Sequence, residues 1–234
     1  MNIVIKKQIL FAIIFIFAGI VALQIPVTHL VGSRASFTAF DSFAPIAGGF
    51  LGGVFGVISV FIIEILQFFI KGAQVLDTGT IIRFFPILFA TIYFAKKSRI
   101  NLILPMIAIA MFIFDPVGRQ VWYFSLFWLI PIVCYFFQER FLLARSLGAT
   151  FTAHAVGGAL WITFLHIPKA AWIGLIPIVA FERLSFALGM ALFYVLVNNL
   201  IGALMKAKIV PFSWPVDLKY VWFKLDHESQ KINT

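Results

Sequence analysis

The chain has 234 residues, of which 62% are hydrophobic and only 12% are charged. Repeated apolar runs of about 20 residues match a bilayer core of about 30 Å, so the composition excludes an ordinary soluble domain and predicts a polytopic membrane protein. The single cysteine, Cys134, excludes an internal disulfide and a cysteine-based metal cluster. The net charge of +9 does not indicate nucleic-acid binding, because Lys and Arg cluster at the ends of apolar runs, as the positive-inside rule requires.

Seven hydrophobic segments follow one another, separated by short turns that contain Gly, Pro or charged residues. The segments are 8–31, 43–70, 79–95, 101–115, 120–138, 146–166 and 171–204. Their length and apolar character predict an all-α fold, a polytopic transmembrane bundle of six to seven helices. The bundle is expected to occupy residues 1–208 as one domain. Residues 209–234 then form a short cytoplasmic or interfacial tail.

The second segment carries a ladder of small residues. Ala44, Gly48, Gly52 and Gly56 recur every four residues, so a continuous helix would place them on one face. In lipid no hydrophobic effect draws helices together, and small residues hold a bundle by close backbone approach. The ladder therefore predicts a helix-packing seam at Gly48, Gly52 and Gly56.

The distribution of Lys and Arg suggests an orientation. A cytoplasmic C-terminus places more of these residues in inside loops than in outside loops. Lys6 and Lys7 favour the inside as well. Both termini can lie inside if segment 43–70 is a re-entrant hairpin that turns at its glycines, which leaves six full spans. The alternative is seven spans with the termini on opposite sides.

Ionisable residues inside the spans are few, and each costs about 2.5–3.5 kcal/mol on insertion scales, so each calls for a partner or a function. Glu64 lies shortly before the turn at Lys71, and Arg83 lies shortly after the start of the next segment. Antiparallel packing would bring the two to similar depth, within about 5 Å. They form either a structural ion pair or a charged wall of a binding cavity.

A second polar group belongs to the last two segments. His154 lies about 12 residues before the end of one, and Glu182 with Arg183 lies about as far after the start of the next. In an antiparallel hairpin the three reach one level, about 16–18 Å below the outer end. They form either a neutralised triad that fixes helix register or a polar site near the bilayer midplane, with Trp161 in its lining.

Other motifs are missing or unremarkable. The sequence contains no zinc-protease motif, no nucleophile elbow and no nucleotide-binding phosphate loop. We therefore expect no metal and no cofactor, and active uptake would need an energised partner. Asn198 and Asn199, near the inner end of the last segment, are expected to hydrogen-bond across helices.

Two stretches carry a resemblance to a known family. They are the segment Asp41–Gly56 and the closing region Ser146–Gly202, which includes Leu147–Gly158 and Ile176–Arg183. Together with the small size and helical membrane character, they resemble a substrate-capture (S) subunit of energy-coupling factor transporters.

The resemblance implies a six-helix bundle that captures a vitamin or metal-related solute from outside. Such a bundle docks on a separate transmembrane coupling subunit driven by two cytoplasmic ATPases. The family docks through an Ala-x-x-x-Ala step on its first helix, which Ala18 and Ala22 match. Seven segments exceed the six spans of the family. If the N-terminal helix is the extra one, the glycine ladder is the better docking candidate.

The leading hypothesis is a solute-binding subunit of a multi-component importer in the plasma membrane, without catalytic activity, for a small water-soluble solute such as a vitamin. His154, Glu182 and Arg183 would contact the solute, with Arg183 pairing with a carboxylate or phosphate. Glu64 and Arg83 would shape the cavity. One alternative is a non-catalytic membrane scaffold or assembly protein. Another is an intramembrane enzyme with His154 as general base, oriented by Glu182.

Overall fold

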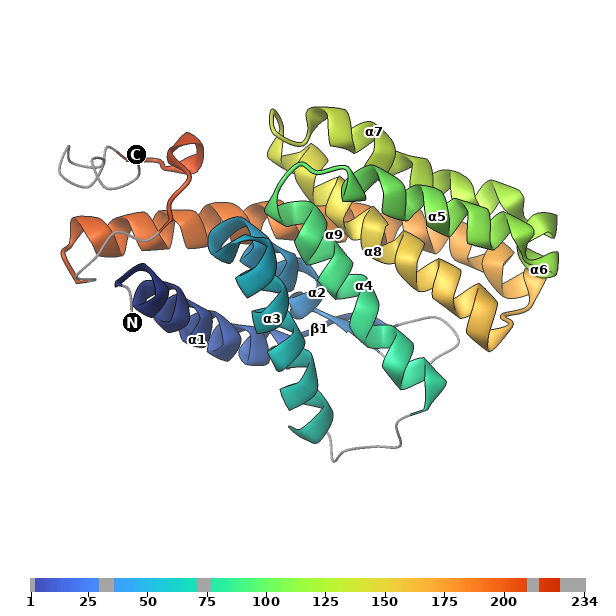
Figure 1. Ribbon diagram of the computed structural model, residues 1–234, viewed down its shortest axis with the longest axis horizontal. Helices are drawn as coiled ribbons and strands as arrows, with labels where there is room; N and C mark the ends of the chain where they lie inside the picture. The colour runs from blue at the N-terminus through green and yellow to red at the C-terminus, as the bar shows by residue number, and fades with distance from the viewer. Residues whose placement is uncertain (1–2, 30–35, 71–76, 210–214, 224–234) are drawn as a thin grey trace.

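The computed structural model describes residues 3–29, 36–70, 77–209 and 215–223. These residues form helices and a short antiparallel pair of strands, so the all-α class is confirmed (Figure 1). The longer helices are α1 (Ile3–Leu23), α3 (Ala47–Ile70), α4 (Thr78–Ala95), α5 (Ile100–Phe114), α7 (Leu129–Phe137), α8 (Leu142–Leu165) and α9 (Lys169–Lys206). The short elements are β1 (Pro26–His29), β2 (Ser36–Thr38), α2 (Ala39–Phe43), η1 (Ala44–Ile46), α6 (Pro116–Gln120), η2 (Trp122–Trp128) and η3 (Leu218–Tyr220).

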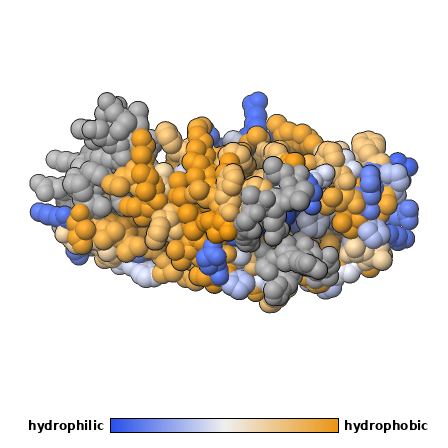
Figure 2. Space-filling model, turned by 90° about the horizontal axis from the view of Figure 1, so that it is seen from below, coloured by the Kyte–Doolittle hydropathy of each residue, from blue (hydrophilic) through white to orange (hydrophobic). Residues whose placement is uncertain are grey.

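Four helical stretches of the described chain are long and apolar enough to cross a membrane. They are Ala39–Ile70, Thr78–Ala95, Leu142–Leu165 and Lys169–Lys206. Large apolar side chains are exposed on these and on the shorter helices; Phe114 and Phe181 are 76% and 75% accessible. Hydrophobic residues also cover most of the face seen in Figure 2. Such a surface suits lipid rather than water. The number of six to seven spans stays a prediction.

Local chemistry explains where several helices begin and end. Asp77 caps α4 by accepting a hydrogen bond from the backbone N–H of Thr80 at 2.7 Å. Asp115 caps α6 in the same way, and Pro168 precedes the first residue of α9. The first predicted segment, 8–31, is too long, because α1 ends at Leu23 and the chain becomes extended at Pro26.

The glycine ladder does not lie on one continuous helix. Gly52 has φ 78° and ψ 176°, a backbone conformation that breaks α3 into two pieces. The sharp bend brings Gly56 against the backbone of Ala47 and Gly48. Gly48 itself contacts the backbone of α4 at Thr91, where a Cβ atom would have no room. Gly48 and Gly56 therefore serve close packing, as expected, but Gly52 is a bend, and the single shared face was wrong.

Helices α4 and α8 form the centre of the molecule. Glycines on α8 let large side chains of its neighbours approach its backbone: Gly148 faces the ring of Tyr93, and Gly158 faces Trp128. Tyr93 also donates a hydrogen bond to the carbonyl of Pro131 at 2.8 Å. Two aromatic cores result, one around α1–α4 and the inner part of α9, the other around α5, η2 and α8.

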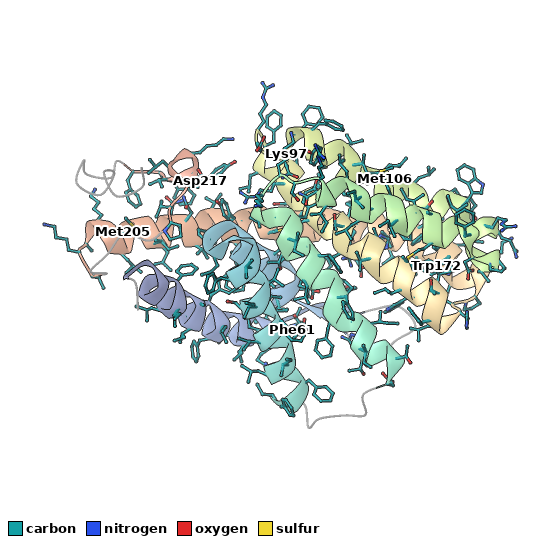
Figure 3. The ribbon with its side chains drawn as sticks, viewed as in Figure 1. Phe61, Lys97, Met106, Trp172, Met205 and Asp217 are labelled. Carbon is teal, nitrogen blue, oxygen red and sulfur yellow. The ribbon has the colours of Figure 1, made fainter. Side chains whose placement is uncertain are left out.

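Asn198 and Asn199 hold the C-terminal segment rather than a neighbouring transmembrane helix. The side chain of Asn198 exchanges two 2.8 Å hydrogen bonds with the backbone of Asp217. Asn199 donates to the carbonyl of Tyr220 and accepts from the N–H of Trp222. Asp217 accordingly lies beside the C-terminal half of α9 (Figure 3). Residues 210–214 and 224–234 of the expected tail, and the expected turn at Lys71, are outside the described residues.

Candidate functional site

A cavity of about 300 Å³ lies between the two aromatic cores. Its walls come from α1, α2, β2, α3, α4, α8 and α9, so residues far apart in sequence meet there. Six residues were predicted from the sequence to form the solute site, and all six line this cavity: His154, Glu182, Arg183, Trp161, Glu64 and Arg83. A volume near 300 Å³ is the lower end of the range typical of small-molecule sites.

The ring of His154 is fixed by a tryptophan. Trp128 Nε1 donates a hydrogen bond to His154 Nδ1 at 3.0 Å. An indole N–H is only a donor, so Nδ1 is the unprotonated nitrogen and the ring proton is on Nε2. His154 therefore offers the cavity an N–H donor. A general base needs a free lone pair facing its substrate, and in this arrangement Trp128 occupies that lone pair.

Glu182 and Arg183 form a buried pair. Arg183 Nη2 lies 3.6 Å from Glu182 Oε2, and the two side chains are 8% and 7% exposed. The guanidinium also packs against Phe37 and Phe186, at 4.8 and 4.9 Å from the ring centroids, and these two rings contact each other edge-to-face. Thr28 of β1 donates to Glu182 at 3.4 Å. Arg183 is thus neutralised locally, although its buried Nε–H has no acceptor among the described residues.

Two further polar residues line the cavity. Asp41 of α2 accepts a hydrogen bond from the N–H of Thr38 at 2.8 Å and is within electrostatic reach of Arg183 and Arg83. Gln67 is buried, and its Nε2 has no acceptor within the described part of the chain. Asp41 could have been found as a carboxylate in an apolar run. No comparable signal marks Gln67.

Glu64 and Arg83 face the same cavity from α3 and α4. An ion pair between them is not among the ion pairs that the described residues form. Arg83 is exposed and has neither an ion pair nor a hydrogen bond to any described residue. Both side chains line the cavity, and their role as a charged wall of a binding site stays a prediction.

Ala18 and Ala22, which the resemblance suggested for docking a coupling subunit, pack against other parts of this chain. Ala22 is 7% exposed and packs in the core around α1–α4, and Ala18 packs against that core. The two alanines are therefore not on an outward face of α1. Among the described residues, no group of three or more His, Cys, Asp or Glu side chains is placed to hold a metal ion.

Comparison with known proteins adds one distant relative. The chain is 25% identical, over 178 residues, to an uncharacterized protein of the archaeon Methanocaldococcus jannaschii. The aligned region covers 67% of this chain and 59% of the relative, so the chain spans about three fifths of the relative's length. No family model and no solved structure matches the chain.

Proposed function

We propose that this protein spans the membrane and binds a small water-soluble solute in the cavity between α4, α8 and α9. The observation that carries the proposal is the convergence of six ionisable groups on a cavity inside an otherwise apolar bundle. They are Asp41, Glu64, Arg83, His154, Glu182 and Arg183. Ionisable groups inside a membrane-spanning bundle are costly and mark solute or ion pathways.

The walls suit a solute rather than a lipid chain. A site for an acyl chain would be uniformly apolar, whereas this cavity combines aromatic rings with fixed polar groups, the usual composition of small-molecule sites. The described chain carries no nucleotide-binding loop, so uptake of the solute would depend on an energised partner. On this proposal the protein is the solute-binding subunit of an importer in the plasma membrane.

A direct test compares small molecules that remain bound to purified protein. Wild-type protein is washed, denatured and extracted, and the extract is analysed by mass spectrometry beside that of Ala153→Phe, which places a ring in the cavity wall. Ala171→Phe, on an exposed position of α9, is the matched control. We expect a molecule that is present with wild type and the control and depleted with Ala153→Phe. Identical extracts from all three folded proteins would contradict the proposal.

A further inference from the structure

The polar groups of the cavity differ in how far their hydrogen bonds are satisfied. Glu182 accepts a hydrogen bond from Thr28 and forms an ion pair with Arg183, and Asp41 accepts from a backbone N–H. By contrast, the Nε–H of Arg183 and the Nε2 of Gln67 lack acceptors among the described residues. A buried donor without an acceptor is costly. The cavity therefore complements a ligand that brings hydrogen-bond acceptors.

Two donors at different depths line the cavity, Arg83 from α4 and His154 from the adjacent helix α8. Pro86 of α4 and Gly157 of α8 lie side by side, since a Cβ atom on Gly157 would be 3.4 Å from Pro86. Arg83 is three residues from Pro86 toward one end of the bundle. His154 is three residues from Gly157 toward the other end, because α4 and α8 run antiparallel. Six residues at 1.5 Å each separate the two levels by about 9 Å.

Aromatic side chains also line the cavity. Trp161 and Trp172 contribute from α8 and α9, and Phe84 contributes from α4 next to Arg83. Trp172 uses its own N–H for the carbonyl of Ile167 at 3.2 Å, so it offers a ring surface rather than a donor. A cavity lined by aromatic rings favours a flat, aromatic ligand, because stacked or edge-to-face rings add binding energy beyond that of the buried area.

Building on the proposed function, we propose that the solute is an elongated aromatic anion. Its acidic group pairs with Arg83, whose guanidinium has no ion pair or hydrogen bond among the described residues, and its far end carries an acceptor for the Nε2–H of His154. Arg183, which the sequence suggested for the anion, instead forms part of the wall. A cation is the contrary possibility, since three carboxylates and two guanidinium groups line the cavity.

The test uses three matched probes: 4-carbamoylbenzoate, benzamide, which lacks the carboxylate, and 4-(aminomethyl)benzamide, which replaces it with a cation. Binding to the full chain in detergent is measured by calorimetry and by tryptophan fluorescence. We expect 4-carbamoylbenzoate to bind about tenfold or more tightly than either other probe, the value of one charge-assisted contact.

Two substitutions assign the ends of the probe. Arg83→Gln should abolish the preference for 4-carbamoylbenzoate over benzamide, while Arg119→Gln, outside the cavity, should preserve it. His154→Asn keeps an acceptor for Trp128, but its amide N–H groups are too short to reach the position of Nε2, so binding of 4-carbamoylbenzoate and of benzamide should weaken about tenfold. His154→Gln keeps a donor near the position of Nε2 and should restore binding. Melting temperatures show that each variant is folded.

The inference is wrong if the cationic probe binds as tightly as the anion, if no probe binds, or if Arg83→Gln leaves the preference unchanged. These outcomes are separable from failure of the proposed function. A solute recovered from purified protein that lacks an acidic group or a ring would refute the ligand class alone. Absence of any cavity-dependent solute would refute the function itself.

Discussion

At the scale of single residues, the glycines of the ladder have different structural roles. Gly48 and Gly56 allow two backbones to touch, whereas Gly52 has open space around it and is set by its dihedral angles. A φ of 78° with ψ near 180° is a region that side chains with a Cβ rarely occupy. The bend of α3 therefore depends on the backbone freedom of one glycine.

We expect Gly52→Ala to destabilise the protein by about 1–3 kcal/mol, because the alanine must hold a strained backbone. The measurement is the unfolding temperature in detergent. Gly174→Ala is the matched control, since Gly174 lies in α9, a Cβ added there would meet no atom within 4 Å, and alanine favours a helix. Equal unfolding temperatures for the two variants would show that Gly52 is not strained.

Cavity residues could be predicted from the sequence where they are ionisable, because ionisable residues are rare in an apolar run. His154, Glu182 and Arg183 could be found because a buried charge needs a reason. Trp128 could not, since nothing in the sequence distinguishes it from five other tryptophans; its role depends on α7 and η2 packing against α8. The pairing of Arg183 with the adjacent Glu182 likewise depends on rotamers that a sequence does not specify.

At the scale of elements, two helix ends depend on side-chain caps. Asp77 accepts from Thr80 at the start of α4, and this hydrogen bond holds the pKa of the carboxyl below its usual 3.8. Arg145 satisfies the carbonyls at the other end of α4, donating to Phe94 and to Ala95 at 2.5 and 3.0 Å. Caps of this kind supply partners that the last turn of a helix lacks.

The Asp77 cap predicts a pH dependence. A carboxyl whose pKa is lower in the folded state stabilises the helix end above the unfolded pKa, and loses that effect as the pH falls through the folded pKa. Amide exchange at Thr80 should therefore be slow at neutral pH relative to its intrinsic rate and lose protection as the pH falls through the folded pKa of Asp77, which lies below 3.8. Asp77→Asn, which caps without titrating, should remove the change; a persisting change would assign it to another group.

The C-terminal segment is held by four side-chain-to-backbone hydrogen bonds from Asn198 and Asn199. Replacing both residues with leucine should release Asp217–Trp222 from α9, so limited proteolysis would cut this segment faster than in wild type. Lys219→Ala, which removes one contact to the carbonyl of Arg140, should have a small effect. Unchanged proteolysis of the double variant would mean that the two asparagines do not hold the segment.

Helix boundaries were predictable within a few residues wherever an apolar run met a cap or a proline, as at Asp77 and Pro168. The strands β1 and β2 were not, since they lie in and beside a run that is hydrophobic enough for a helix. The prediction that the ladder forms one packing face was wrong for a related reason. A four-residue period of glycine looks the same whether the residues pack a continuous helix or bend it.

At the scale of the whole molecule, basic side chains gather at one end. Lys96, Lys97 and Arg99 join α4 to α5, and Arg140 joins α7 to α8. Lys219 of η3 donates to the carbonyl of Arg140, so the C-terminal segment lies at this end too. Figure 1 also shows the start of α1 near the C-terminal end of α9. The positive-inside rule predicts that this end is the cytoplasmic one.

This orientation predicts a labelling pattern in intact cells. With Cys134 replaced by alanine, single cysteines at Arg119 and Lys169 should react with a membrane-impermeant maleimide. Cysteines at Ser98 and Glu139 should react only after permeabilisation. The reverse pattern would place the basic end outside and invert the orientation.

The proposed function requires that a solute occupies the cavity. A cryo-electron microscopy map of protein purified from its native membrane tests this most directly. We predict compact density enclosed by His154, Trp161 and Arg183, with one end reaching Arg83. Water alone, a lipid tail entering from the side, or side chains collapsed into the space would contradict the account.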